Sequence, residues 1–150
     1  MLDGATCTAK RSLGRISSSI LEVDAHTLTT MKITRCLHAA LLVSDLERSE
    51  HFYGLVLGLE KVDRVLRFPG AWYEVAGFQI HLIVAAAFTT ELDNPEKWGR
   101  NRHIAFSVAS LEAAKEQLIA HNCPLQMSAS GRAALFTQDP DGNVIELGEV

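Results

Sequence analysis

The chain has 150 residues, of which 47% are hydrophobic and 21% are charged, as in an ordinary globular domain that can bury a core. Its formal net charge of −4 and pI of about 5.8 give no sign of a nucleic-acid-binding surface. No apolar run is long enough to span a membrane, and three cysteines without metal-site spacing favour a reduced, cytoplasmic location.

The first 30 residues differ in composition from the rest of the chain. They are rich in Ser, Thr and small residues and contain no continuous apolar segment of a secretory signal. We therefore expect a disordered N-terminal tail over residues 1–30, followed by a single domain over residues 31–150.

Regular structure is expected from Thr34 onward. The pattern predicts a strand over residues 35–43, and Ser44-Asp45-Leu46-Glu47 is a capping box that begins a helix. Leu46, Glu50, Tyr53 and Leu57 would form one stripe of that helix, which Gly58 ends. Three short strands are expected over residues 61–67, 71–75 and 78–84.

The same order of elements returns after a polar linker from Phe88 to Asn101. A strand is predicted over residues 102–108, a helix over 111–121 begun at Ser110, and strands near 125–128, 133–138 and 143–149. The chain thus predicts an α+β fold of two βαβββ modules, over residues 35–84 and 100–149, that form a curved mixed sheet around a cleft.

An internal repeat supports the two modules. Residues 35–82 align without a gap with residues 100–147, and ten of these 48 positions are identical, among them His38 and His103. One unlike pair in the alignment is His81 and Glu146. A glutamate within an apolar, β-branched strand is costly to bury unless another group pairs with it.

Strand periodicity places these four residues on the faces that lie opposite the apolar, helix-facing sides. If Ala76-Gly77 closes a two-residue hairpin, Trp72 lies opposite His81, and by the same count Thr137 lies opposite Glu146. Gln79 and Asn101 share the faces of His81 and His103. Trp72, Gln79, Asn101 and Thr137 are therefore the candidate substrate-binding residues.

The four candidate metal ligands are His38, His81, His103 and Glu146. Three imidazoles and one carboxylate suit Zn²⁺, Ni²⁺, Co²⁺, Fe²⁺ or Mn²⁺, whereas a single buried histidine is more often a hydrogen-bonded structural residue. Arg100 and Arg102 flank a site strand and could bind an anionic substrate, although the parity of Arg102 directs it away from His103.

The two modules, the opening Leu37-His38-Ala39-Ala40-Leu41-Leu42-Val43-Ser44-Asp45-Leu46 and the closing Asp139-Pro140-Asp141-Gly142-Asn143-Val144-Ile145-Glu146 resemble the vicinal oxygen chelate superfamily. This superfamily contains glyoxalases, epimerases, dioxygenases and bleomycin resistance proteins. The resemblance implies a glyoxalase-like fold with one divalent metal ion per site, held by His38, His81, His103 and Glu146. A histidine at position 81 departs from the common family patterns.

The resemblance implies a lyase or isomerase of the glyoxalase I/epimerase kind that chelates a small molecule with two adjacent oxygens, with Glu146 moving the proton. An Fe²⁺ extradiol-type dioxygenase that uses His38, His103 and Glu146, with His81 unligated, is the first alternative. A non-catalytic small-molecule-binding or resistance protein is the second. We also expect a homodimer, because each module contributes only two ligands; the site could form within one chain or across two chains.

Overall fold

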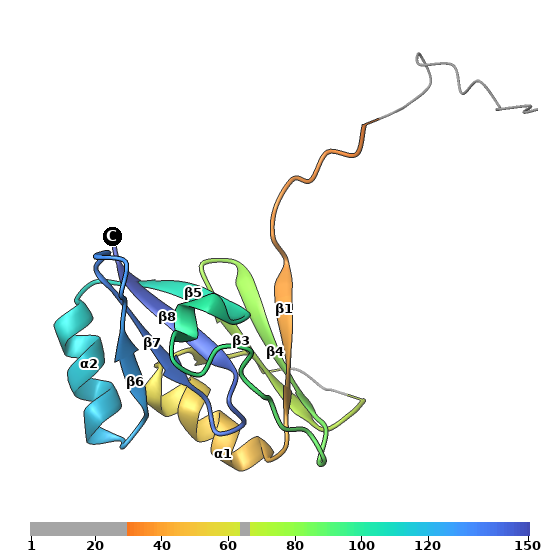
Figure 1. Cartoon of the computed structure of the whole chain (residues 1–150). Helices are drawn as coiled ribbons and strands as arrows, with labels where there is room; N and C mark the ends of the chain where they lie inside the picture. The colour runs from red at the N-terminus through yellow and green to blue at the C-terminus, as the bar shows by residue number, and fades with distance from the viewer. Residues whose placement is uncertain (1–29, 64–66) are drawn as a thin grey trace, which may run out of the picture. The chain divides into compact units, whose positions relative to one another are not determined.

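The computed structural model describes residues 30–63 and 67–150, so the predicted tail lies outside the described residues except for Thr30. By its internal contacts the chain divides into Met1–Thr34 and Arg35–Val150. Residues 30–34 are exposed and belong to no helix or strand. All the elements below belong to Arg35–Val150 (Figure 1). No helix in the described ranges is long and apolar enough to cross a membrane.

Each module contains four strands and one main helix. The first module consists of β1 (His38–Val43), α1 (Leu46–Glu50), the π-helix η1 (His51–Val56), β2 (Glu60–Lys61), β3 (Gly70–Val75) and β4 (Phe78–Val84). A 3₁₀ turn, η2 (Trp98–Arg100), ends the linker. The second module consists of β5 (His103–Val108), α2 (Leu111–Ala120), β6 (Leu125–Met127), β7 (Ala134–Gln138) and β8 (Val144–Glu149).

The strands form two four-stranded mixed sheets with equivalent topology. Their orders are β1-β4-β3-β2 and β5-β8-β7-β6. In each sheet the first and last strands of the module pair in parallel, and the remaining pairs are antiparallel. The predicted α+β class with two βαβββ modules is therefore confirmed, and the repeat in the sequence corresponds to a repeat in topology.

The first helix differs from the prediction in its winding. It begins within the predicted capping box but one residue later than the pattern implies, because Asp45 and not Ser44 is the N-cap, and the Asp45 side chain accepts a hydrogen bond from Arg48 N. The helix then continues as a π-helix after Glu50. The buried residues are Ser49, Phe52, Tyr53 and Val56, so Tyr53 is the one fully buried residue of the predicted stripe. Leu46 and Leu57 of that stripe are partly buried against the core. Gly58, at φ 69°, follows the helix as predicted.

The helix-facing sides of both sheets contribute to one hydrophobic core. Its buried residues come from both modules: Val43, Phe52, Tyr53, Val56, Ala71, Tyr73, Ile80 and Leu82 from the first, and Leu118, Leu135, Ile145 and Leu147 from the second. The opposite faces of β1 and β5 are exposed at His38, Ala40 and Leu42 and at His103, Ala105 and Ser107. The side of each edge strand that bears the candidate ligands is therefore uncovered.

The turn over residues 139–143 joins the second module to the first. Asp141 accepts hydrogen bonds from the backbone N (3.0 Å) and the hydroxyl of Ser44, and the Asn143 amide donates to Leu42 O at 3.0 Å. Gly142 has a φ of 86°, and a Cβ there would lie 3.2 Å from Thr90 O. The backbone conformation thus favours the glycine of the motif, and the linker lies close to it.

Asp139 is the buried centre of this junction. Its carboxylate accepts hydrogen bonds from Tyr53 Oη at 2.9 Å, from the backbone N of Asp141 and Asn143, and from the Asn143 amide. Burial raises the pKa of Asp139, although the hydrogen bonds from Asn143, Tyr53 and Asp141 lower it. Burial and the nearby Asp139 charge raise the pKa of Tyr53 well above its usual value. Tyr53 therefore remains protonated and a hydrogen-bond donor at neutral pH.

Tyr53→Phe should reduce the free energy of unfolding by about 1–3 kcal/mol, because it removes a donor from a buried carboxylate. Chemical denaturation at neutral pH measures this. Tyr73→Phe is the matched control, since Tyr73 is equally buried but its hydroxyl is 3.5 Å from its acceptor, Glu50 O. We expect a smaller loss for the control. Equal losses for the two variants would contradict a special role for the Asp139 contact.

Candidate functional site

In the first module, β1 and β4 bring two of the predicted ligands together. In the parallel register, His81 of β4 lies beside Ala40 of β1. His38 lies two residues before Ala40, on the same face of β1. The His81 ring lies between two other rings: Trp72, with centroids 3.6 Å apart, and His38, with centroids 4.2 Å apart. The predicted pairing of Trp72 with His81 across the hairpin is confirmed. We call Trp72, His81 and His38 the first half-site.

Gln79 fixes the orientation of the His81 ring. The Gln79 amide donates from Nε2 to Glu74 Oε2 at 3.4 Å, and its Oε1 is 3.0 Å from His81 Nε2. Because an amide oxygen only accepts hydrogen bonds, His81 Nε2 holds the proton in this arrangement. Ligation of a metal by His81 would require its other ring nitrogen or the loss of the Gln79 contact.

The second module brings the other two predicted ligands into direct contact. His103 Nε2 is 3.0 Å from Glu146 Oε2, and Glu146 Oε1 accepts a hydrogen bond from Arg132 Nη2 at 3.0 Å. Glu146 is buried, with 7% of its surface exposed, although it lies in a strand of apolar neighbours. We call His103, Glu146 and Arg132 the second half-site.

The tautomer of His103 follows from its second contact. His103 Nδ1 is 2.7 Å from the backbone carbonyl of Asn101, which can only accept, so Nδ1 holds a proton. Nε2 then faces Glu146 Oε2 either as a second N–H donor, in a doubly protonated ring, or with its lone pair. Two lone pairs do not meet at 3.0 Å unless a proton or another cation lies between them. The same orientation, with Nδ1–H on a carbonyl, is typical of histidines that bind a metal through Nε2.

The four predicted ligands form two pairs and not one cluster. Within residues 30–63 and 67–150, no group of three or more His, Cys, Asp or Glu residues is placed to hold a metal ion. His38 and His81 stack in the first half-site, whereas His103 and Glu146 contact each other in the second. The donor types and the His103 tautomer fit a divalent metal, but a complete ligand set requires both half-sites.

One sequence prediction on this face is wrong. Thr137 pairs with Ile145, and Phe136 is the residue opposite Glu146. The hairpin of β3 and β4 has a two-residue turn, but β7 and β8 are joined by residues 139–143, which shifts the register by one residue. Thr137 is therefore on the core side, where it is fully buried and its hydroxyl donates to Pro124 O at 2.8 Å.

Asn101 has a structural part in the second half-site. Its amide donates to the carbonyls of Asn94, Lys97 and Trp98, and its Oδ1 accepts a hydrogen bond from Asn94 N. These bonds fold the end of the linker and thereby hold the Asn101 carbonyl against His103. Asn101 and His103 also line a cavity of about 430 Å³ between β1, β5 and residues 88–93.

The sequence pattern did not identify Arg132 and Phe136 as residues of the site. Arg132 holds one oxygen of Glu146, and the Phe136 ring meets the His103 ring edge-on, with centroids 5.6 Å apart. The repeat contained a signal for the first, because Arg132 aligns with Arg67. Phe136 gave no signal, since its placement depends on the length of the turn after β7.

Comparisons with protein families, known sequences and solved structures all return glyoxalase-related proteins. A family model described as the Glyoxalase/Bleomycin resistance protein/Dioxygenase superfamily matches residues 35–147. The chain is 30% identical over 125 residues to the "Uncharacterized protein YwkD" of Bacillus subtilis (strain 168), covering 75% of this chain and 94% of that protein. It is 28% identical over 131 residues to "Glyoxylase I 4" of Arabidopsis thaliana, covering 78% and 71%. A solved glyoxalase/dioxygenase from Nostoc punctiforme superposes with a TM-score of 0.64 at 26% identity, covering 77% of this chain and 90% of that one.

Glu146→Gln should leave the stability of the protein almost unchanged. The new amide can accept from Arg132 through its oxygen and donate to the lone pair of His103 Nε2, so every buried polar group keeps a partner. Thermal unfolding should show a change in melting temperature of less than about 3 °C. Glu146→Ala, which removes both contacts, should cost about 1–3 kcal/mol. A large loss for Glu146→Gln would show that the fold depends on the charge of Glu146.

Proposed function

The chain belongs to the Glyoxalase/Bleomycin resistance protein/Dioxygenase superfamily, and from this membership we propose that it is a divalent-metal-dependent lyase or isomerase of the glyoxalase I/epimerase kind. The fold is the glyoxalase-like fold. Members of the superfamily generally use a divalent metal. The proposed substrate is a small molecule with two adjacent oxygens, and the predicted cytoplasmic location belongs to the same proposal.

The observation that supports this proposal is the contact between His103 Nε2 and Glu146 Oε2. The contact joins two side chains that are both metal ligands when deprotonated, and a proton or a metal ion can occupy the position between them. The carboxylate of this pair is buried. His38, His103 and Glu146 would hold the metal, with His81 as a further candidate. When bound, the metal supplies Lewis-acid stabilisation of negative charge on the two substrate oxygens.

The residues of the chain then have distinct parts in the reaction. Glu146 would take a proton from the substrate carbon at Oε2 and return it to a neighbouring carbon. Arg132 holds Oε1 of the same carboxylate and so fixes the direction from which Oε2 acts. The Asn101 carbonyl orients His103. Trp72 and Gln79, which surround His81, would contact the substrate from the first half-site.

Completion of the site is proposed to involve a second copy of the chain. The described residues hold only two ligands in each half-site. The faces of β1 and β5 that bear His38 and His103 are exposed, and both strands are sheet edges. A two-fold partner can place its second half-site opposite the first half-site of this chain, which would produce two sites per homodimer.

One observation favours the Fe²⁺ dioxygenase as a second candidate. His81 Nε2 is hydrogen-bonded to Gln79, and the ring is enclosed by Trp72 and His38. A His81 that stays in this arrangement leaves two histidines and one carboxylate, His38, His103 and Glu146, as the ligands. This is the donor set of non-haem Fe²⁺ oxygenases.

Metal titration tests the proposal. Purified protein should bind one Zn²⁺ or Ni²⁺ per chain in isothermal titration calorimetry, and His103→Ala or Glu146→Ala should remove stoichiometric binding because each deletes one ligand. His121→Ala is the matched control, since His121 caps α2 and contacts His51 rather than either half-site. Wild-type protein that binds no divalent metal would refute the proposal. Unchanged affinity in His81→Ala would favour the dioxygenase ligand set.

Mixed variants test whether two chains form the site. His38→Ala and Glu146→Ala proteins, unfolded and refolded together, should regain metal binding in the mixed dimers, where one of two sites combines intact half-sites. With random pairing the metal content should reach about a quarter of the wild-type value. Each variant refolded alone should bind none. No recovery in a mixture that contains mixed dimers would mean that each chain forms its own site.

A further inference from the structure

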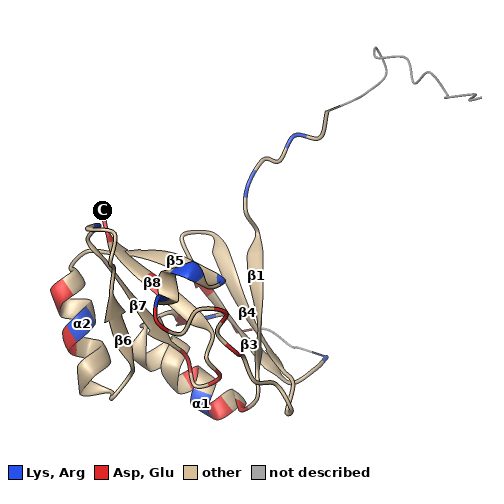
Figure 2. Cartoon of the chain, viewed as in Figure 1, with Lys and Arg blue, Asp and Glu red and all other residues tan. Residues whose placement is uncertain are grey.

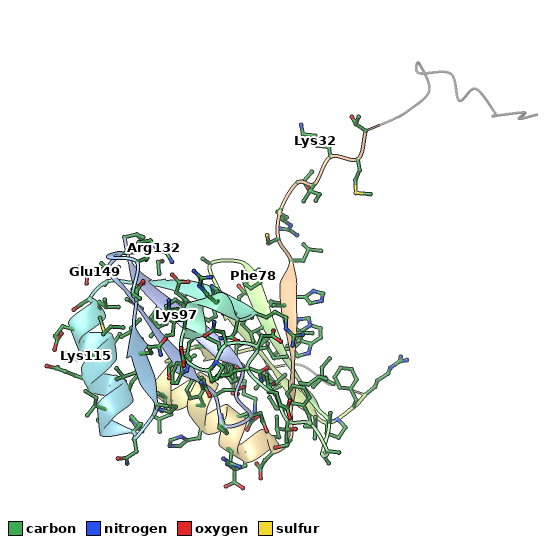
Figure 3. The ribbon with its side chains drawn as sticks, viewed as in Figure 1. Lys32, Phe78, Lys97, Lys115, Arg132 and Glu149 are labelled. Carbon is green, nitrogen blue, oxygen red and sulfur yellow. The ribbon has the colours of Figure 1, made fainter. Side chains whose placement is uncertain are left out.

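A basic pocket lies beside the second half-site. Its volume is about 270 Å³, and its lining includes three cations, Lys97, Arg100 and Arg132, together with Gln126, Ser128 and Ser130. Lys97 and Arg132 are labelled in Figure 3, and Figure 2 marks the Lys and Arg positions along the ribbon in blue. No carboxylate is among the described residues that line it.

The positive charge of this pocket is only partly neutralised. Arg132 pairs with Glu146, but neither Lys97 nor Arg100 has a carboxylate within 4.0 Å among the residues that the structure describes. The hydroxyls of Ser128 and Ser130 are 2.9 Å apart, and Arg132 Nε donates to Ser130 at 3.3 Å. The pocket therefore offers cationic and hydroxyl donors and a local excess of positive charge.

The position of these cations is set by specific contacts. Gln126 accepts a hydrogen bond from Trp98 N at 2.8 Å and donates to Glu96 O at 2.9 Å, which fastens η2 to β6. Gly99 lies directly on the Phe136 ring, since a Cβ at Gly99 would be 2.6 Å from Phe136 Cζ. Lys97 and Arg100 flank this close approach. Their backbone positions are therefore held by packing and hydrogen bonds.

Two residues of the pocket also contact the second half-site. Phe136 meets the His103 ring, and Arg132 holds Glu146 Oε1 at 3.0 Å. A molecule that places an anionic group among Lys97, Arg100 and Arg132 thus lies one side chain away from His103, through Phe136, and contacts Arg132, which holds Glu146. Arg100, which the sequence marked as a possible anion-binding residue, belongs to this pocket; Arg102 does not line it.

We propose that this pocket binds a carboxylate or phosphate group of the substrate, so that the substrate class is an organic anion whose charged end lies beside its reacting oxygens. This inference rests on the proposed function, which identifies the two adjacent oxygens as the end of the substrate that reacts. Arg100 and Lys97 recognise the charge, while Arg132 links the occupied pocket to Glu146. These residues determine which substrates bind. Their side chains donate charge-assisted hydrogen bonds to the oxygens of the anion.

Anion titration of the metal-free full-length chain tests this inference. Inorganic phosphate and malonate, followed by amide shifts in NMR spectra, should perturb residues of η2 and of the segment 128–132. Arg100→Gln should weaken the tighter of the two anions about tenfold, the factor expected for one lost charge-assisted contact. Lys97→Gln should have a similar effect, and higher ionic strength should weaken binding further. Lys115→Gln, which removes an equal charge on α2, should leave the affinity unchanged.

The outcome separates this inference from the proposed function. Tighter binding of phosphate would identify a phosphate-bearing substrate, and tighter binding of malonate a carboxylate-bearing one. Absence of binding, or binding that Arg100→Gln and Lys97→Gln leave unchanged, would overturn the inference even if metal binds as proposed. Melting curves of the two variants, expected to match the wild type because both side chains are exposed, show that the fold is retained.

Discussion

The structure depends on the buried Asp139 carboxylate and the hydrogen bonds that surround it. Tyr53 from the first module and the turn of the second module meet at this group, and Ser44 binds the neighbouring Asp141. The junction joins the modules on their helix-facing sides, where their apolar residues form one core. As a consequence, the opposite faces of the two edge strands remain exposed, and these faces bear His38 and His103. The junction around Asp139 holds the two modules together and leaves each half-site exposed.

The second half-site shows how the fold accommodates a buried carboxylate. Glu146 follows Ile145 and precedes Leu147, both in the core, and its burial is balanced by Arg132 on one oxygen and His103 on the other. The Asn101 carbonyl fixes the imidazole, and Asn101 is itself held by the linker. Such successive orientation of a ligand by neighbouring groups is typical of metal and proton-transfer sites. The basic pocket extends this arrangement toward a charged substrate group.

Local pattern predicted the modules well because each strand, helix and tight turn is determined by nearby residues. The strand from 78 to 84 and the pairing of Trp72 with His81 followed from a two-residue turn. The same reasoning failed for Thr137, because the turn over residues 139–143 is longer and shifts the register. Periodicity also could not predict the π-helix after Glu50, nor the contact of Arg132 with Glu146. The separation of the ligands into two half-sites depends on how whole modules pack, which no local pattern encodes.

The central claim is that one metal site combines the first half-site of one chain with the second half-site of another. A crystal structure of the zinc-loaded protein, with the ion located by anomalous scattering, tests it most directly. We expect one ion per chain, bound by His103 and Glu146 of one chain and by His38 of its two-fold partner. An ion bound by His38, His103 and Glu146 of the same chain, or an ion that does not contact Glu146, would contradict the account.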